Sequence, residues 1–396
     1  MEADMRVVVI GGGVAGSATA IAMHRAGIDA EIYERHPGVA DDVGLFLTFA
    51  GNGMDALDVL GAGAEVEATA FPTPRMVMRS GTGRVLGSMS NGDASRTIRR
   101  ADLYRALRDE VVRRGIPIHY GKALADVESS ANGVRARFAD GTDAGGDLLV
   151  GADGLHSPTR RLIDRDAPAP RYVPVLNTGG YARGVHVDAE PGTFTMVFGK
   201  RAFFGYVPAP NGEVWWFANP PHPTPPSAAE LAGMNAGDTW RQRLLELYAD
   251  DATPAVALID ASTNPMSGWA TYDLPAVPNW HRDRMVLVGD AAHATSPSSG
   301  QGASLAIEDA VVLAKSLRDV PDRSDALATY VGIRRPRVER IVKAGARSSS
   351  MKVAGPVGRV LRDAMMPLFL PMASRMMKTD WMHRYHIDWD APVSAA

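Results

Sequence analysis

The stretch of sequence that decides the fold is Met285-Val-Leu-Val-Gly-Asp-Ala-Ala-His-Ala-Thr-Ser-Pro-Ser-Ser-Gly-Gln-Gly-Ala-Ser304. It begins as an apolar strand that ends in Gly289-Asp290, and a loop with two further glycines then leads into a helix. A second turn of this kind, Gly11-Gly-Gly-Val-Ala-Gly16, follows the apolar strand at residues 6–10. Because glycine turns between a strand and a helix bind nucleotide phosphates, two of them far apart in one chain predict a single long dinucleotide held at both of its ends.

The N-terminal turn fits the pattern G-x-G-x-x-G. Its first glycine permits the tight turn, its second lets the backbone approach a pyrophosphate, and its third lets the helix pack on the strand. A helix over residues 17–26 and a strand over residues 29–34 complete a βαβ unit, and the acid that ends this strand can accept hydrogen bonds from an adenosine ribose. On these residues alone FAD and NAD are both allowed. The residues predicted to bind the dinucleotide here are Gly11, Gly13, Ala15, Gly16, Glu34 and Arg35.

The composition is that of a globular protein and excludes several function classes. The 42 basic and 45 acidic residues give a formal net charge of -3, which offers no support for nucleic-acid binding. The absence of cysteine excludes disulfides, thiolate metal sites, iron–sulfur clusters and a thioether-linked cofactor. No His or carboxylate spacing indicates another metal site, and no apolar run is long enough to span a membrane. The N-terminus lacks the pattern of a signal peptide, so a cytoplasmic location is expected.

Two later segments decide between the cofactors. The segment Leu148-Leu-Val-Gly-Ala-Asp-Gly-Leu-His-Ser-Pro-Thr-Arg160 and the Gly289-Asp290 segment resemble the paired motifs of class A FAD-dependent aromatic monooxygenases, the family of p-hydroxybenzoate hydroxylase. The N-terminal turn, Arg100-Ala-Asp-Leu103 and these two motifs occur in the order of that family, so the resemblance covers about residues 5–320. The length and the C-terminal helix make the chain similar to the tetracycline-inactivating members. The segment at residues 44–53 matches the family's motif only loosely.

The resemblance implies how the flavin end of a non-covalent FAD is held. Asp290, at the end of a strand, is expected to accept a hydrogen bond from a ribityl hydroxyl. The loop with Pro297, Gly300 and Gly302 is expected to lie with its backbone against the isoalloxazine ring. A helix over residues 303–317 then directs its positive end toward the N1–O2 edge of the ring, where the reduced flavin carries negative charge.

The resemblance also implies roles for residues outside these turns. Arg100 matches an arginine that reaches FAD, and Asp153 matches a position linked to FAD and NAD(P)H binding. Tyr181 and Arg183 fall at the start of the expected substrate sheet and are predicted to be the catalytic residues that face the flavin and the substrate. His293 is interpreted as a solvent-accessible residue that braces its loop, in preference to a catalytic base.

The character of the chain changes along its length, which predicts an α/β fold of interleaved domains. A discontinuous Rossmann-like FAD-binding domain is predicted over residues 1–70, 96–172 and 276–336. An antiparallel substrate-binding sheet, rich in aromatic residues, is predicted over residues 71–95 and 173–275. Residues 337–396 are predicted to form a C-terminal bridging helix and tail. Its methionine-rich face is expected to pack across both domains, in preference to touching a membrane. The methionines of this face are Met365, Met366, Met372, Met376 and Met377.

The resemblance implies a reaction cycle. NAD(P)H reduces FAD, O2 adds at the flavin C4a atom, and the hydroperoxide transfers one oxygen atom to an aromatic or polycyclic small molecule. A flavin dehydrogenase or reductase without oxygen transfer, and a non-catalytic flavin-binding protein, stay open as alternatives. A halogenase is disfavoured because its Trp-x-Trp-x-Ile-Pro signature is missing. The choice between NADH and NADPH, the kind of oxygenation and the oligomeric state are left open.

Overall fold

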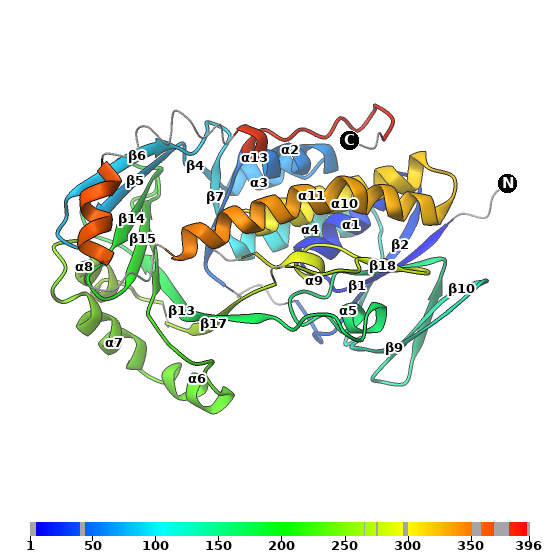
Figure 1. Ribbon diagram of the computed structural model, residues 1–396, viewed down its shortest axis with the longest axis horizontal. Coiled ribbons are helices and arrows are strands. Elements are labelled where there is room, and N and C mark those ends of the chain that lie inside the picture. The colour runs from blue at the N-terminus through cyan, green and yellow to red at the C-terminus, as the bar shows by residue number, and fades with distance from the viewer. Residues whose placement is uncertain are drawn as a thin grey trace.

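The computed structural model shows two regions side by side along the long axis of the molecule (Figure 1). One is built on a mostly parallel sheet flanked by helices, and the other on a mostly antiparallel sheet. The α/β class predicted from the sequence is therefore confirmed. The described residues are 5–39, 44–264, 266–274, 276–295, 300–350, 358–367 and 380–393.

The parallel sheet forms because its central strands are short apolar runs that can be buried on both faces. Its strand order is β18-β19-β12-β1-β2-β8, with β18 as an antiparallel edge. Since β1, β12 and β19 are parallel neighbours, the turns that follow them emerge at one edge of the sheet. The strands are β1 (Arg6–Ile10), β2 (Asp29–Glu34), β8 (Ile118–Tyr120), β12 (Leu148–Gly151), β18 (His281–Arg282) and β19 (Met285–Leu287).

Helices pack around this sheet and against one another. Helix α10 is buried along nearly its whole length, because it packs against α1, α2 and α11. Helix α11 begins earlier than the helix predicted from residue 337, and it continues through Pro336. The bounds of these helices are α1 (Val14–Arg25), α2 (Gly51–Leu60), α3 (Gly63–Thr69), α4 (Arg100–Arg113), α5 (Pro158–Ile163), α9 (Asp290–His293), α10 (Gly302–Asp319) and α11 (Arg323–Ser350).

The second sheet has the order β17-β13-β16-β15-β14-β5-β6. All its neighbours are antiparallel except β14 and β5. Strands β5 and β6 come from the predicted insertion at residues 71–95 and join those of residues 173–275; the exact domain bounds stay a prediction. The strands are β5 (Arg75–Ser80), β6 (Val85–Ser90), β13 (Arg171–Ala182), β14 (Thr193–Phe198), β15 (Phe203–Pro208), β16 (Val214–Asn219) and β17 (Gly268–Asp273).

Smaller elements complete the two regions. A three-stranded sheet of β3, β7 and β4 precedes α4, and a second one of β11, β10 and β9 lies on the outside of the nucleotide-binding region. Ser157 is the N-cap of α5, where its side chain accepts a hydrogen bond from the Arg160 backbone nitrogen. The remaining bounds are β3 (Phe46–Phe49), β4 (Phe71–Pro72), β7 (Arg96–Arg99), β9 (Leu124–Ser130), β10 (Gly133–Phe138), β11 (Asp143–Gly146), α6 (Ala228–Met234), α7 (Thr239–Tyr248), α8 (Ala255–Asp260) and α13 (Asp380–His383).

The two faces of the second sheet have different neighbours. Trp215 and Trp216 are adjacent on β16 and therefore point to opposite faces. Trp216 packs in a core with Trp240 of α7 and Leu258 of α8, so helices cover that face. Trp215 lies in a separate cluster with Phe71. Both tryptophans are buried, because the second face of this sheet packs against β3 and β4.

The C-terminal part of the chain contacts both regions. Residues 358–367 form a helix in which Met366 packs on the second sheet, while Met365 is 41% exposed. Residues 380–393 lie against the helices of the first region, where the Lys315 ammonium donates to the Asp388 carbonyl oxygen over 2.7 Å. The other residues of the predicted methionine-rich face lie outside the described residues; they are Met372, Met376 and Met377.

Candidate active site

The N-terminal glycine turn is packed so closely that only glycine fits at two of its positions. Gly11 has a φ of +104°, and a Cβ atom there would lie 2.5 Å from the Ala152 carbonyl oxygen. A Cβ atom on Gly16 would lie 1.8 Å from the Gly11 carbonyl oxygen. On the open side, a Cβ atom on Gly13 would meet only the Tyr104 ring, at 3.7 Å. The turn is thus closed toward β12 and open where a pyrophosphate would approach the start of α1.

Glu34 ends β2 and braces this turn. Its Oε2 atom accepts a hydrogen bond from the Gly12 backbone nitrogen over 2.7 Å, and its Oε1 atom accepts one from the His36 backbone nitrogen over 2.8 Å. Each carboxylate oxygen can accept a second hydrogen bond, so Glu34 can still bind a ribose hydroxyl. Arg35 follows it and is exposed.

The two glycine turns, far apart in the sequence, touch each other. Gly289 has a φ of +59°, and a Cβ atom on it would lie 2.9 Å from the Ala15 side chain. The side chain of Asp290, at the start of α9, is exposed and makes no hydrogen bond within the described part of the chain. This contact places the Gly289-Asp290 turn beside the phosphate-binding turn, as a dinucleotide that spans both requires.

Of the loop that precedes α10, the described end at Gly300 and Gly302 has room beside its backbone. Among the described residues, a Cβ atom on Gly300 would meet nothing within 4 Å, and one on Gly302 would meet only the Thr295 hydroxyl, at 3.5 Å. Helix α10 begins at Gly302, so its positive end faces this loop. Pro297, predicted to lie in the same loop, is outside the described residues.

Asp153 follows β12 and has one oxygen without a partner. Its Oδ2 atom accepts hydrogen bonds from the Thr159 backbone nitrogen over 3.0 Å and from the Thr159 hydroxyl over 2.6 Å. Its Oδ1 atom is buried and makes no hydrogen bond in the structure. Burial raises the pKa of Asp153. A buried acceptor of this kind beside Gly11 is suited to a hydroxyl or a water of a bound cofactor.

Arg100 lies between the phosphate-binding turn and the segment that precedes β3. Its backbone nitrogen donates to the Leu45 carbonyl oxygen over 2.9 Å, and its side chain lies against Gly44. Its guanidinium donates to the Tyr104 hydroxyl over 3.3 Å. Because the Tyr104 ring is also the neighbour of Gly13, the predicted cofactor arginine stands next to the phosphate-binding turn.

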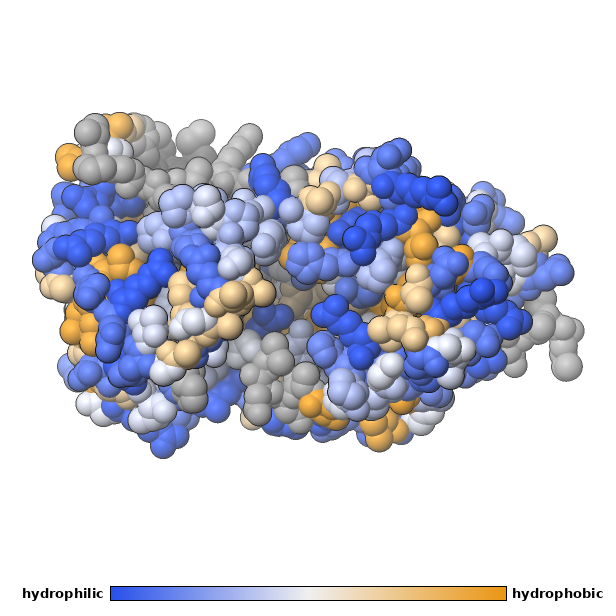
Figure 2. Space-filling model, turned by 90° about the horizontal axis from the view of Figure 1, so that it is seen from below, coloured by the Kyte–Doolittle hydropathy of each residue, from blue (hydrophilic) through white to orange (hydrophobic). Residues whose placement is uncertain are grey.

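One face of the second sheet forms an aromatic wall together with Phe46 of β3. We define this wall as Phe46, Tyr181, Trp215 and Phe217. The Tyr181 ring meets Trp215 edge to face at a centroid distance of 5.4 Å, and Phe46 lies 5.6 Å from the same indole. Burial raises the pKa of Tyr181 to about 12, so the phenol stays neutral at ordinary pH. Seen from below, the surface is hollowed between the two ends of the molecule (Figure 2).

Arg183 stands at the end of this wall but does not project freely. It donates two hydrogen bonds to the Glu213 Oε1 atom, over 2.7 and 3.0 Å, while 77% of its side chain is exposed. Tyr181 lies near the end of β13 and Arg183 directly follows this strand, and their catalytic roles stay a prediction. Sequence reasoning missed the buried carboxylate that holds the arginine. The sequence offered one indication of Glu213, because this charged residue directly precedes the apolar strand Val214–Asn219.

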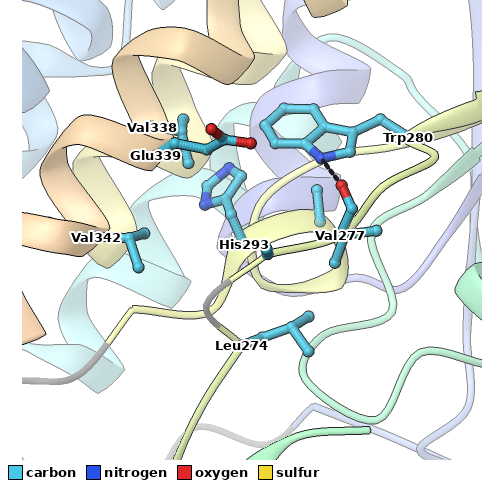
Figure 3. A pocket seen from close by; sticks show the side chains of 9 residues that line it. Leu274, Val277, Trp280, His293, Val338, Glu339 and Val342 are labelled. Carbon is cyan, nitrogen blue, oxygen red and sulfur yellow. Dashed lines mark hydrogen bonds between the residues drawn. The ribbon is translucent and has the colours of Figure 1, made fainter. Parts of the chain in front are cut away.

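His293 is buried, contrary to the solvent access expected for it. Its Nε2 atom lies 2.5 Å from the Asp309 Oδ2 atom, which also accepts from the Gly289 backbone nitrogen over 2.9 Å. Its Nδ1 atom has no hydrogen-bond partner among the described residues, and the side chain lines a cavity of about 10 Å³, the size of one water. Figure 3 shows the ring between Glu339 and Val277 at this cavity. His293 therefore braces its loop through Asp309.

Asp309 belongs to a buried ionic cluster that sequence reasoning missed. Arg334 donates to the Asp309 Oδ1 atom over 2.7 Å and to the Glu308 Oε2 atom over 2.5 Å, and all three side chains are fully buried. Asn52 of α2 donates both to Glu308, over 2.6 Å, and to Gln301, over 2.9 Å. The cluster therefore ties the turn at Gly289 and the loop before α10 to helices α2 and α11.

The part of the chain that the structure describes contains neither a group of side chains suited to a metal ion nor a helix suited to cross a membrane. No group of three or more His, Asp or Glu side chains is placed to hold a metal ion there. Within the same residues, every helix is too short or too polar to cross a membrane.

Comparison with known proteins identifies the relatives of this chain. The model of the FAD binding domain family matches residues 4–345. The FAD-dependent urate hydroxylase of Klebsiella pneumoniae is 32% identical over 350 residues, which cover 85% of this chain and 88% of that protein. The 3-amino-4-hydroxybenzoate 2-monooxygenase PtmB3 of Streptomyces platensis is 32% identical over 412 residues and 98% of each chain.

The fold is shared with a solved flavoprotein. The crystal structure of Klebsiella pneumoniae HpxO complexed with FAD and uric acid has a TM-score of 0.84 and 27% sequence identity, and it covers 96% of this chain and 97% of that one. The predicted family resemblance, the predicted fold and the predicted cofactor FAD are thereby confirmed.

Proposed function

We propose that this chain, which belongs to the FAD binding domain family, is a single-component monooxygenase that inserts one atom of O2 into an aromatic or polycyclic small molecule, with NAD(P)H as electron donor. The observation that carries the proposal is the contact between Gly289 and Ala15, which joins the two dinucleotide turns into one site. The aromatic wall beside that site supplies a surface for a planar substrate.

The residues present fit FAD. The open side of Gly13 and the start of α1 would take the pyrophosphate, Glu34 and Arg35 the adenosine ribose, and Asp290 a ribityl hydroxyl. The unpaired Asp153 Oδ1 atom fits a hydroxyl or a bridging water. When bound, FAD supplies electron transfer from NAD(P)H and the activation of O2.

The chain's own groups would provide binding, orientation and electrostatics around the reaction. The positive end of α10, at Gly302, favours negative charge at the loop beside it. The aromatic wall would stack a planar substrate and exclude water from it. Tyr181, neutral and half-buried, would donate a hydrogen bond to a polar group of the substrate, and Arg183 would orient the substrate at the end of the wall.

The proposal is tested by substrate-dependent turnover. NAD(P)H oxidation by the FAD-loaded protein is expected to accelerate when a substrate from an aromatic panel is added, with consumption of one O2 and appearance of an oxygenated product. Acceleration with a reduced product and without O2 consumption would favour the dehydrogenase or reductase alternative, because the added compound then accepts the electrons of NAD(P)H. FAD binding with no turnover on any compound would favour a non-catalytic flavin-binding protein.

A further inference from the structure

The helix of residues 358–367 turns its polar side chains toward the protein and apolar side chains toward solvent. The partly buried side chains on its inward face are Arg359, Arg362, Asp363 and Met366. The exposed side chains, which we define as the outer face of this helix, are Val360, Leu361, Ala364 and Met365. At 3.6 residues per turn the two sets lie on opposite sides. The arrangement is the reverse of that in an ordinary surface helix, whose apolar face is buried.

Contacts of the inward face fix this orientation on the second sheet. Arg359 donates to a backbone carbonyl oxygen in the turn between β14 and β15 over 2.7 Å. The Arg362 guanidinium carbon lies 4.6 Å from the centroid of the Phe198 ring. Met366 packs against the apolar cluster that contains Phe198, and Phe217 of the aromatic wall packs against the same cluster. The helix therefore cannot turn its outer face inward without losing these contacts.

Exposed apolar side chains gather at this end of the molecule. Seven large ones are exposed in the part of the chain that the structure describes, and three of them belong to the outer face. Two more, Val85 and Val256, lie on β6 and α8 at the same end (Figure 1). The backbone of Gly81, before β6, bonds both to Phe198 beneath the helix and to Ala252 before α8. Single exposed apolar residues are ordinary, whereas such a group marks a contact surface.

The charges beside the outer face have a positive sum. The cations of the helix, of the turn between β14 and β15, and of the residue before Val85 are Arg359, Arg362, Lys200, Arg201 and Arg84. The carboxylates that bond to this turn or to the helix are Asp250, Asp251 and Asp363. Five cations against three carboxylates leave +2, in a chain with a formal net charge of -3. An anionic partner therefore suits this end better than a cationic one.

The size of the surface decides between a second copy of the chain and a membrane. The exposed parts of four side chains on one short helix amount to much less than the about 800 Å² that each partner of a stable complex buries. Two such ends would also bring like charges together. A bilayer needs no matching shape, and a helix with apolar residues outward and arginines beside them is suited to lie in the lipid interface.

We propose that the outer face docks the protein peripherally on an anionic lipid bilayer. Val360, Leu361 and Met365 enter the boundary between the headgroups and the acyl chains, and the neighbouring cations contact the lipid phosphates. Docking itself is independent of the proposed function. One consequence rests on it: because Met366 and Phe217 share one cluster, a docked helix brings the lipid beside the substrate wall, where an apolar substrate would arrive from the bilayer.

Vesicle flotation of the FAD-loaded full chain tests the proposal without turnover. The probes are vesicles of phosphatidylcholine alone and vesicles with about one-third phosphatidylglycerol. The protein is expected to float with the anionic vesicles, to float less with the neutral ones, and to be partly released by about 0.5 M NaCl. Val360→Asp is expected to lower the partition coefficient about tenfold or more, because a charge then enters the lipid interface.

A matched control separates this effect from that of an added charge. Val112 of α4 is 62% exposed and Val360 is 67% exposed, so Val112→Asp makes the same change at a similar position of the other region. It is expected to leave the partition coefficient unchanged. Leu361→Asp, at 58% exposure, carries the test should Val360→Asp lose FAD.

Several outcomes would overturn the proposal. These are no flotation with either kind of vesicle, flotation of Val360→Asp equal to that of the unaltered protein, or an equal loss in Val112→Asp. A dimer in light scattering that Val360→Asp converts to a monomer, with no vesicle binding, would assign the outer face to a second copy instead. Vesicle binding through this face by a protein that oxygenates nothing would refute only the proposed function.

Discussion

Replacement of Asp309 by asparagine tests whether the buried ionic cluster holds the cofactor turns in place. Both carboxylate oxygens of Asp309 are used: one by Arg334, and the other by the Gly289 backbone nitrogen and by His293. Asparagine keeps the size of the side chain and replaces one oxygen with an NH2 group that faces a donor. The change therefore removes a charge and at least one hydrogen bond in a fully buried site.

The expected loss of stability depends on which partners Arg334 keeps in the variant. Breaking a buried ion pair costs about 3–5 kcal/mol when the partner is left alone. Arg334 keeps its bond to Glu308, so we expect a loss near the lower end, about 3 kcal/mol, in the free energy of unfolding of the apoprotein. FAD affinity is expected to fall as well, since Asp309 fixes the backbone of Gly289 next to Asp290.

Urea unfolding of the apoprotein and FAD titration measure the two effects. Asp143→Asn is the matched control, because it makes the same chemical change in an exposed pair with Arg135, where the expected cost is about 0.2–1 kcal/mol. If Asp309→Asn costs no more than Asp143→Asn, or if it destabilises the protein with no change in FAD affinity, the cluster does not support the cofactor turns as argued.

Three further predictions concern the site. Asp290→Ala is expected to raise the Kd of FAD with little change in apoprotein stability, because the Asp290 side chain is exposed, whereas His293→Ala is expected to lower stability because His293 is buried. FAD titration and urea unfolding measure the two effects, and a larger rise of the Kd in His293→Ala or a larger loss of stability in Asp290→Ala would contradict this. Tyr181→Phe and Arg183→Ala are expected to change turnover while the FAD content, read from absorbance, stays near normal. Loss of FAD in either variant would contradict the assignment of this sheet to substrate binding. The pKa of Glu213 is lowered from 4.5 to about 2, so its contribution to stability is fully present above pH 4.5 and disappears as the pH falls toward 2. Glu213→Gln is therefore expected to flatten the curve of unfolding free energy against pH between these values. An unchanged curve would contradict the assigned ion pairs.

The local parts of the site could be predicted from the sequence because each is encoded within a few residues. The turn Gly11–Gly16 and the acid at Glu34 both depend on backbone geometry that short patterns determine. The order of the motifs predicted which turns would meet, and the parallel neighbours β1, β12 and β19 bring them together.

The ionic groups could not be predicted, since their partners are far apart in the chain. Asn52 and Gln301 are 249 positions apart, and Arg99 and Glu213 are 114 positions apart. One signal was available: Glu308 and Asp309 stand side by side in the otherwise apolar stretch of α10, and buried carboxylates require partners. The burial of His293 could not be predicted either, because its partner Asp309 lies 16 positions away on α10.

Incorporation of labelled O2 tests the central claim most directly. The FAD-loaded protein, NAD(P)H and an accepted aromatic substrate are incubated under ¹⁸O2, and the product is analysed by mass spectrometry. The account predicts one labelled oxygen atom in each product molecule, with no label when ¹⁸O is supplied only in water. A product without label from O2, or one whose new oxygen comes from water, would contradict the assignment of monooxygenase activity to this site.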